Sequence, residues 1–159
     1  MISKPSQMPT LRTFTLIGLC IGALALLAGC AAESEHAGTF DPQTGQFAPC
    51  PDNPNCVSSQ ESGEQHGIEP LPFAGDLANT KARILELVNA MPRAQIETDT
   101  PNYLHVTFRS RIFRFVDDVE FHFDETRAVV DFRAAARTGY SDMGVNRARM
   151  ETIRQEVAE

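Results

Sequence analysis

Cysteine has the most distinctive chemistry in this chain, and Cys30 is the first informative one. It closes the stretch Leu-Ala-Gly-Cys, which has the pattern of a lipobox, where a signal peptidase cleaves and the new N-terminal cysteine carries lipid. Lys4 and Arg12 precede an apolar run that ends in small residues, as in a secretory signal. A transmembrane helix is the alternative, because residues 14–32 supply about 19 mostly apolar positions. We expect residues 1–29 to be a lipoprotein signal peptide and Cys30 to be lipidated.

Cys50 and Cys56 are the two thiols that remain beyond Cys30. An exported protein meets oxidising conditions, so two nearby thiols favour a disulfide bond. The alternative is a metal site with Asp52 or His66 as a further ligand, although structural zinc sites usually have four ligands and closer cysteines. We therefore predict a Cys50–Cys56 disulfide and no metal or other cofactor.

Asp117 is the first acidic side chain that could do chemistry. It alternates in step with the apolar residues of a predicted strand over 112–123, so a regular strand would turn this carboxylate toward the core. We expect a bulge at 116–118 that rotates Asp117 outward. The alternative is an inward carboxylate paired with Arg137 or Arg147.

The turn at 137–142 is a second candidate, because Gly139 permits a tight bend before a predicted helix. A helix N-terminus with arginines nearby can bind an anion. The alternative is that Ser141 or Asp142 caps the helix while Arg137 pairs with Asp118 or Glu120. The candidate binding residues are Asp117, Asp118, Arg133, Arg137, Tyr140, Ser141, Asp142, Asn146 and Arg147.

Two helices and a run of strands must position these side chains. Asp76 is the predicted N-cap of a helix over 77–91, and a second helix is expected from Ser141 or Asp142 to Val157. Alternating apolar and polar residues predict strands over the following ranges: 103–110, 112–123 and 128–136, with room for a further short strand around 94–98. We predict a two-layer α+β domain, an antiparallel sheet of about three to four strands packed against two helices.

Each predicted strand has an apolar and a polar face. The apolar face of the 112–123 strand carries Phe113, Phe115, Val119, Phe121 and Phe123. The polar faces carry His105, Thr107, Arg109, Arg114, Glu120, His122, Asp131 and Arg133. Opposite charges on neighbouring strands form solvated salt bridges worth about 0.2–1 kcal/mol per pair, which we expect here. The alternative is a ligand-binding or docking face.

The chain divides into three parts by composition. After the signal peptide, residues 30–49 have few bulky apolar side chains, which is typical of a flexible tether. Residues 50–159 are expected to form a single globular α+β domain. The formal net charge is −7, and the signal peptide takes two basic residues with it. This acidity argues against nucleic acid, and against anionic lipids held by charge alone.

Three motifs resemble one protein family. They are Cys-Pro-Asp-Asn-Pro-Asn-Cys-Val-Ser-Ser from Cys50, Phe-Val-Asp-Asp-Val-Glu-Phe from Phe115, and Arg-Ala-Ala-Ala-Arg-Thr-Gly-Tyr-Ser-Asp-Met-Gly-Val-Asn-Arg from Arg133. In this order they resemble the domain of unknown function (DUF) 1499 family, here as a bacterial lipoprotein. The resemblance implies no assigned activity and no catalytic residues. Asn53 replaces a frequent hydroxyl residue of the family, and alanines at 134 and 136 replace expected serines, so a mechanism that needs those hydroxyls is not expected.

The sequence lacks the common catalytic motifs, including a P-loop, a Gly-x-Ser-x-Gly elbow and His-Glu-x-x-His. We therefore expect a non-enzymatic envelope lipoprotein with a small molecule or another envelope protein as its partner. Ala31 after Cys30 favours the outer membrane, with the domain facing the periplasm and the lipid as its membrane attachment. The alternative is a hydrolase-like enzyme with a site around Asp117, Asp118, Arg133 and Arg137.

Overall fold

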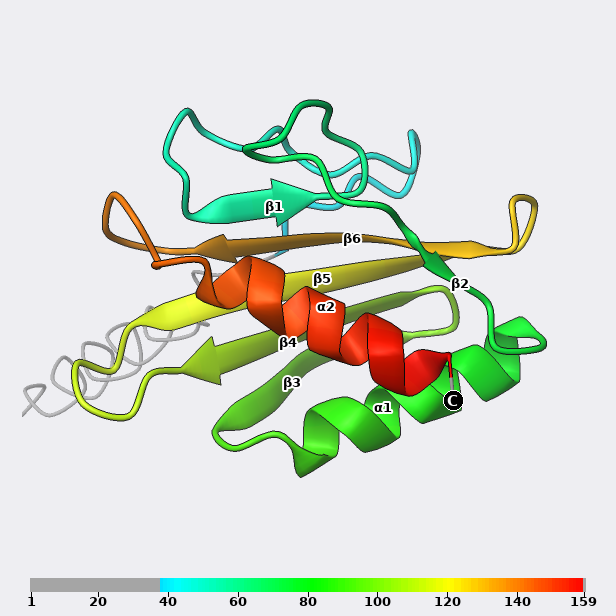
Figure 1. The fold of residues 1–159 in the computed structure, drawn as a ribbon. Coiled ribbons are helices and arrows are strands. Elements are labelled where there is room, and N and C mark those ends of the chain that lie inside the picture. Colours follow the sequence, from blue (N-terminus) through cyan, green and yellow to red (C-terminus); the bar gives the residue numbers. More distant parts are fainter. Residues whose placement is uncertain (1–37, 159) are drawn as a thin grey trace, which may run out of the picture. The chain divides into compact units, whose positions relative to one another are not determined.

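A six-stranded antiparallel sheet forms the centre of the computed structural model, which describes residues 38–158 (Figure 1). The predicted signal peptide, Cys30 and the first part of the tether lie outside the described residues. The elements follow the order β1 (Cys56–Ser58), β2 (Leu71–Pro72), α1 (Leu77–Ala90), β3 (Ala94–Thr100), β4 (Tyr103–Arg109), β5 (Val116–Asp124), β6 (Val129–Ala136) and α2 (Val145–Val157).

The predicted α+β class is confirmed, but the sheet is larger than the three to four strands expected. Its order is β1-β6-β5-β4-β3, and β2 also pairs with β6. β1 and β2 have three and two residues, too few to show an alternating pattern in the sequence. They form because the outer edge of β6 offers backbone groups that need partners.

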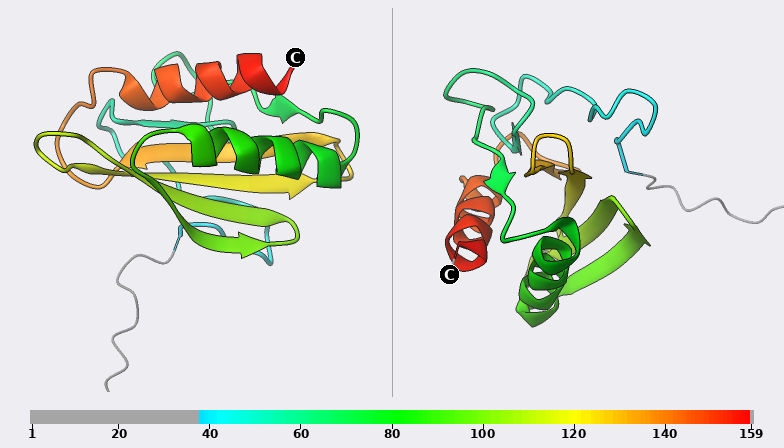
Figure 2. Two further views of the ribbon diagram at one scale, coloured as in Figure 1. Left: turned by 90° about the horizontal axis from the view of Figure 1, so that it is seen from below. Right: turned by 90° about the vertical axis from the view of Figure 1, so that its right-hand side faces the viewer.

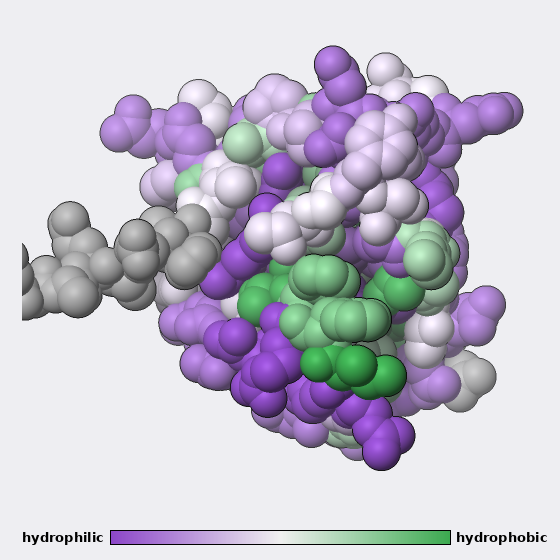
Figure 3. Space-filling view, turned by 90° about the vertical axis from the view of Figure 1, so that its left-hand side faces the viewer, coloured by the Kyte–Doolittle hydropathy of each residue, from purple (hydrophilic) through white to green (hydrophobic). Residues whose placement is uncertain are grey.

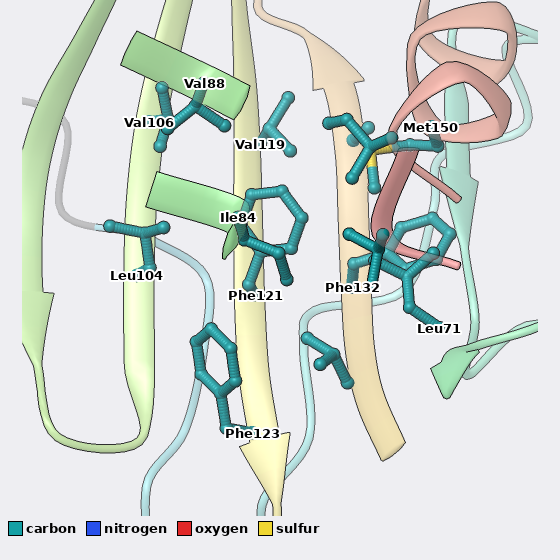
Figure 4. Packing of buried hydrophobic residues seen from close by; sticks show 14 of the residues in the cluster. Leu71, Ile84, Val88, Leu104, Val106, Val119, Phe121, Phe123, Phe132 and Met150 are labelled. Carbon is teal, nitrogen blue, oxygen red and sulfur yellow. The ribbon is translucent and has the colours of Figure 1, made fainter. Parts of the chain in front are cut away.

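Both helices cover one face of the sheet (Figure 2). The Asp76 carboxylate accepts a hydrogen bond from the Asn79 amide at 2.8 Å, which confirms the predicted cap of α1. Ile84 and Val88 of α1 are buried, as are Met150 and Ile153 of α2. Between the helices and the sheet lies a continuous apolar core (Figure 4), whose sheet side is Leu104, Val106, Phe108, Val119, Phe121, Phe123, Val130, Phe132 and Ala134.

The predicted strand over 112–123 is wrong at its start, because β5 begins only at Val116. Phe113 and Phe115, expected in the core, are exposed. Arg114 has a φ of 56°, in the left-handed region that interrupts a strand. Two hydrogen bonds join Ser110 and Phe115, one from the Ser110 amide to the Phe115 carbonyl and one from the Phe115 amide to the Ser110 hydroxyl. Residues 110–115 therefore form a closed loop between β4 and β5.

The other face of the sheet carries the start of the described chain. Residues 38–49, which the sequence placed in the tether, run along this face (Figure 2). The Phe40 ring lies 5.0 Å from that of Tyr103 and 4.6 Å from that of His122, measured between ring centroids. The polar face is consequently buried rather than solvated at its centre: Ser58, His105, Thr107, Glu120, Asp131 and Arg133.

The second helix begins at Val145, three residues after Asp142. Asp142 still serves the helix start, because its carboxylate accepts hydrogen bonds from the Gly144 and Asn146 amides at 3.0 and 2.7 Å. The Ser141 hydroxyl accepts one from the Met143 amide. The bond to Asn146 satisfies a backbone donor that a helix leaves open at its first turn, and the other two hold the turn before the helix.

Candidate functional site

Asp117 faces the helices, and the strand around it has no bulge. β5 keeps an unbroken register with β4 over residues 116–122 and with β6 over residues 117–124. The expected bulge is therefore wrong, and the carboxylate is paired instead. Its partner is Arg149 of α2, at 2.8 Å, and neither Arg137 nor Arg147. The Arg149 guanidinium also lies over the Phe108 ring at 4.3 Å, which fixes its position.

Asp118 points to the opposite face of the sheet. Arg137 donates two hydrogen bonds to its carboxylate, at 2.7 and 2.8 Å, and Nε2 of His105 lies 2.8 Å from it. Burial alone raises the pKa of Asp118, but the bonds to Arg137 and His105 outweigh burial and hold this pKa well below its usual range. The same pairing raises the pKa of Arg137. Asp118 is therefore charged at neutral pH and poorly suited to proton transfer there.

His105 is almost fully buried, and its Nδ1 has no hydrogen-bond partner among the described residues. An aspartate–histidine pair can activate a hydroxyl nucleophile when the hydroxyl meets the free ring nitrogen. Tyr103 and Thr107 carry hydroxyls on the same face of β4, and they donate to Glu120 and Glu97, each at 2.7 Å. Neither of these two hydroxyls donates to the free ring nitrogen of His105.

Glu120 is the centre of the remaining polar network. It accepts hydrogen bonds from the Thr39 amide and hydroxyl, the Phe40 amide and the Tyr103 hydroxyl, at 2.6–3.0 Å. Burial and the Glu120 charge raise the pKa of Tyr103 far above its usual value. Arg133 lies opposite Glu120 in the register and donates to the Ala48 carbonyl. Burial lowers the pKa of Arg133, although the charge of Glu120 opposes that shift.

The candidate residues after β6 hold loops together. Arg147 donates to the carbonyls of Glu64, Gln65 and Gly67 at 3.0–3.2 Å. Asn146 is buried, and its side chain contacts the Asn55 carbonyl and the Arg149 guanidinium. Tyr140 is exposed. The N-cap of α2 is Gly144, but the Asp142 carboxylate accepts from the Asn146 amide in the first turn. A carboxylate at this position favours the capping interpretation over the anion site.

The predicted disulfide is present between Cys50 and Cys56, whose Cα atoms are 5.6 Å apart. His66, considered as a metal ligand, instead places Nδ1 2.9 Å from the Cys56 carbonyl. Residues 38–158 contain no group of three or more histidine, cysteine, aspartate or glutamate side chains placed to hold a metal ion.

An exposed apolar patch lies at one end of the sheet, and the sequence pattern does not predict it. Exposed apolar side chains gather at the end of the sheet where β5 begins and β6 ends (Figure 3). We call this the loop-end patch, and it consists of Ile112, Phe113, Phe115, Met143 and Val145. The Arg137 amide donates a hydrogen bond to the Val116 carbonyl, which joins the end of the loop before β5 to the start of the loop after β6. The mixture of arginine and apolar residues at 109–115 could have indicated an exposed loop. The two-residue spacing of Phe113 and Phe115 predicts a strand there instead.

A cavity of about 350 Å³ adjoins the loop-end patch. Its lining includes Val145 and four guanidinium side chains, Arg93, Arg109, Arg111 and Arg149. Asp117 is the one carboxylate in that lining, and Arg149 already pairs with it. The cavity is therefore strongly positive on a chain that is acidic overall.

A wider groove of about 710 Å³ runs between residues 59–70 and α2. Its basic side chains are engaged, because Arg147 and Arg154 bind carbonyls of the same loop. Glu61, Glu64 and Glu151 add acidic groups to the lining. The groove therefore has mixed charge, and its two arginines are already bonded within the chain.

Comparison with known proteins gives one match. A family model described as "Protein of unknown function (DUF1499)" matches residues 46–157, so the chain belongs to this family. No curated protein and no solved structure matches the chain. In the part of the chain that the structure describes, neither helix is long and apolar enough to cross a membrane.

Proposed function

We propose that this DUF1499 protein is an envelope lipoprotein whose α+β domain is a non-enzymatic binding module. Lipid on Cys30 would hold it at the membrane, with the outer membrane and a periplasmic domain as the proposed location. Its ligand is a small molecule or another component of the envelope. We assign recognition to the loop-end patch and the adjoining arginine cavity.

The strongest support is the orientation of the two neighbouring aspartates. A hydrolase-like site would need Asp117, Asp118, Arg133 and Arg137 around one cleft. Asp117 lies on the helix face with Arg149, whereas Asp118 lies on the other face with Arg137. Successive residues of a regular strand point to opposite faces, so no small rearrangement brings both carboxylates together.

A second support comes from the state of the charges. The carboxylates of the sheet face are bonded within the chain: Asp118 to Arg137, Glu120 to residues 39–40, and Asp131 to Arg127 and Ser59. Groups already paired contribute little new binding energy, since a ligand would first have to break those pairs. The loop-end patch instead presents exposed apolar side chains, and Arg109 and Arg111 in the adjoining cavity have no salt bridge within residues 38–158.

The test is capture from intact envelopes with the full-length lipidated protein, analysing proteins and lipids. Phe113→Ser should lose the captured component, because it removes an exposed apolar side chain without touching the core. Glu125→Ser, in the exposed β5–β6 turn at the other end of the sheet, is the matched control. Loss of capture in Asp118→Asn alone, with the fold intact, would contradict the assignment and favour the sheet face.

The anchoring part is tested by mass spectrometry of membrane-extracted protein. The mature N-terminus should be Cys30 carrying acyl chains. An unmodified chain that still begins with Met1 would contradict the lipoprotein proposal.

A further inference from the structure

We infer that the loop-end patch docks onto the surface of a bilayer that contains anionic phospholipid. The apolar side chains would enter the head-group region, and a lipid phosphate would occupy the arginine cavity. This inference deepens the proposed function and rests on it, since it assumes that the domain is kept in the envelope.

The apolar side chains of the patch are exposed to solvent and held in place by the loop. Ile112, Phe113 and Phe115 are 79%, 76% and 53% exposed, and the two phenylalanine rings stack at 5.7 Å. The hydrogen bonds between Ser110 and Phe115 hold the loop closed, so the side chains point outward in a fixed arrangement. Soluble monomers rarely expose such a cluster without a function. Apolar and aromatic side chains at a protein tip suit the boundary between head groups and acyl chains.

The basic side chains beside the patch are equally unusual. Arg93, Arg109 and Arg111 line the cavity, and Arg114 lies between Phe113 and Phe115 in the loop. None of these four arginines takes part in a salt bridge within residues 38–158, although Arg93 donates to the Arg109 carbonyl at 2.8 Å. Basic side chains next to a membrane gain about 1 kcal/mol each from anionic lipids. The chain as a whole carries a net charge of −7, so such attraction would act only at this end and would orient the domain.

The tether is long enough for this arrangement. Gly38 lies eight positions after Cys30, and a chain of that length can span at most about 26–29 Å. Gly38 lies against Glu120 and Tyr103. From Glu120 to the start of β5 at Val116 the chain runs four residues, about 13 Å along the strand. A lipid on Cys30 and the loop-end patch can therefore reach the same bilayer surface.

The arginines beside the patch also argue against a second copy of this chain as its partner. In a symmetric dimer through this surface, the same patch meets itself. Arginines would then face arginines, and like charges at an interface are costly. An acidic protein remains the competing partner, and the experiment below separates it from lipid.

The chain contains no tryptophan, so a single tryptophan is a clean reporter of membrane contact. We would place it at Phe113→Trp in the full lipidated protein, reconstituted into phosphatidylcholine vesicles with and without phosphatidylglycerol. Part of the phosphatidylcholine carries bromine, which quenches tryptophan in the bilayer. The matched control is Thr126→Trp, in the exposed turn at the opposite end of β5.

We expect quenched, blue-shifted emission from position 113 in the vesicles with phosphatidylglycerol, and unquenched emission from position 126. Replacing Arg111 or Arg114 by glutamine should lower the ratio of docked to undocked protein about fivefold for each charge. Added inorganic phosphate should not replace phosphatidylglycerol, since it offers no bilayer.

Solvent-exposed emission from position 113 in vesicles that carry the protein would overturn the inference while leaving the lipid anchor intact. Cross-linking of position 113 to an acidic protein in envelopes, together with no quenching, would overturn it in favour of that partner. If the chain carries no lipid, the proposed lipid anchor is wrong, but the docking inference can still be tested. Quenching by phosphatidylglycerol vesicles added to the unlipidated protein then still decides whether the patch binds lipid.

Discussion

The polar sheet face and the loop-end patch use charge in opposite ways. On the sheet face, Glu120 and Asp118 are surrounded by donors from the chain itself. At the loop-end patch, Arg111 and Arg114 stand among exposed apolar side chains without a carboxylate partner in the described chain. A charge already paired in the fold stabilises the fold, whereas an unpaired charge beside apolar surface is available to a ligand. We therefore propose the loop-end patch, rather than the more polar sheet face, as the binding surface.

The largest effect is expected from Glu120→Ala. The change leaves the Thr39 and Phe40 amides and the Tyr103 hydroxyl without their acceptor, and it removes the charge opposite Arg133. We expect a loss of roughly 3–5 kcal/mol in the free energy of unfolding, measured by chemical denaturation. Hydrogen exchange at residues 39–48 should accelerate. Glu125→Ala, an exposed carboxylate, is the control, and equal effects of both changes would break the comparison.

Asp118→Asn should cost about 3 kcal/mol, because it leaves the Arg137 guanidinium without its ion pair. The loss should depend on pH. The folded pKa of Asp118 lies below its unfolded value, so its contribution is fully present above pH ~4 and declines as the pH falls further toward the folded pKa. The difference in unfolding free energy between the wild type and D118N should shrink in that acidic range. A difference that is constant with pH would contradict the role of the ion pair.

Reducing the Cys50–Cys56 bond, or replacing both residues by serine, tests the segment that leads from residues 38–49 into β1. Opening a loop this short should cost about 2 kcal/mol through the entropy of the unfolded chain. Denaturation with and without reductant measures it, and the double serine variant should not respond to reductant. A reductant effect that persists in this variant would place the redox sensitivity elsewhere.

Arg114→Gly should have the smallest effect on stability and a clear effect on binding. Arg114 has a φ of 56°, where glycine is unstrained, so the fold should be unchanged or more stable by up to about 1 kcal/mol. The same change removes one arginine beside the loop-end patch and should weaken docking to anionic vesicles. Thermal unfolding and vesicle flotation of the unlipidated variant, compared side by side, separate the two effects. Marked destabilisation would show that the loop is structural.

The candidate site could be predicted only in part. Alternation identified the side chains of the sheet face, and the pairing of Arg137 with Asp118 was among the alternatives considered. The partner of Asp117 could not be found, because Arg149 lies 32 residues away on a helix whose rotation is set by packing. The loop-end patch escaped notice for a local reason. Two exposed phenylalanines separated by one arginine show the same two-residue period as a buried strand, and nothing in the period reports the left-handed φ of Arg114.

The amino-acid sequence alone predicts the family, the disulfide, the capped helix α1 and the α+β class, because each can be inferred from patterns within short segments. The positions of residues 38–49 on the sheet and the partners of Asp117 and Asp118 on its two faces depend on the tertiary fold. The contacts responsible join residues far apart, such as Thr39 and Glu120, which are 81 positions distant. Such contacts form when packing brings elements together, and no local pattern encodes them.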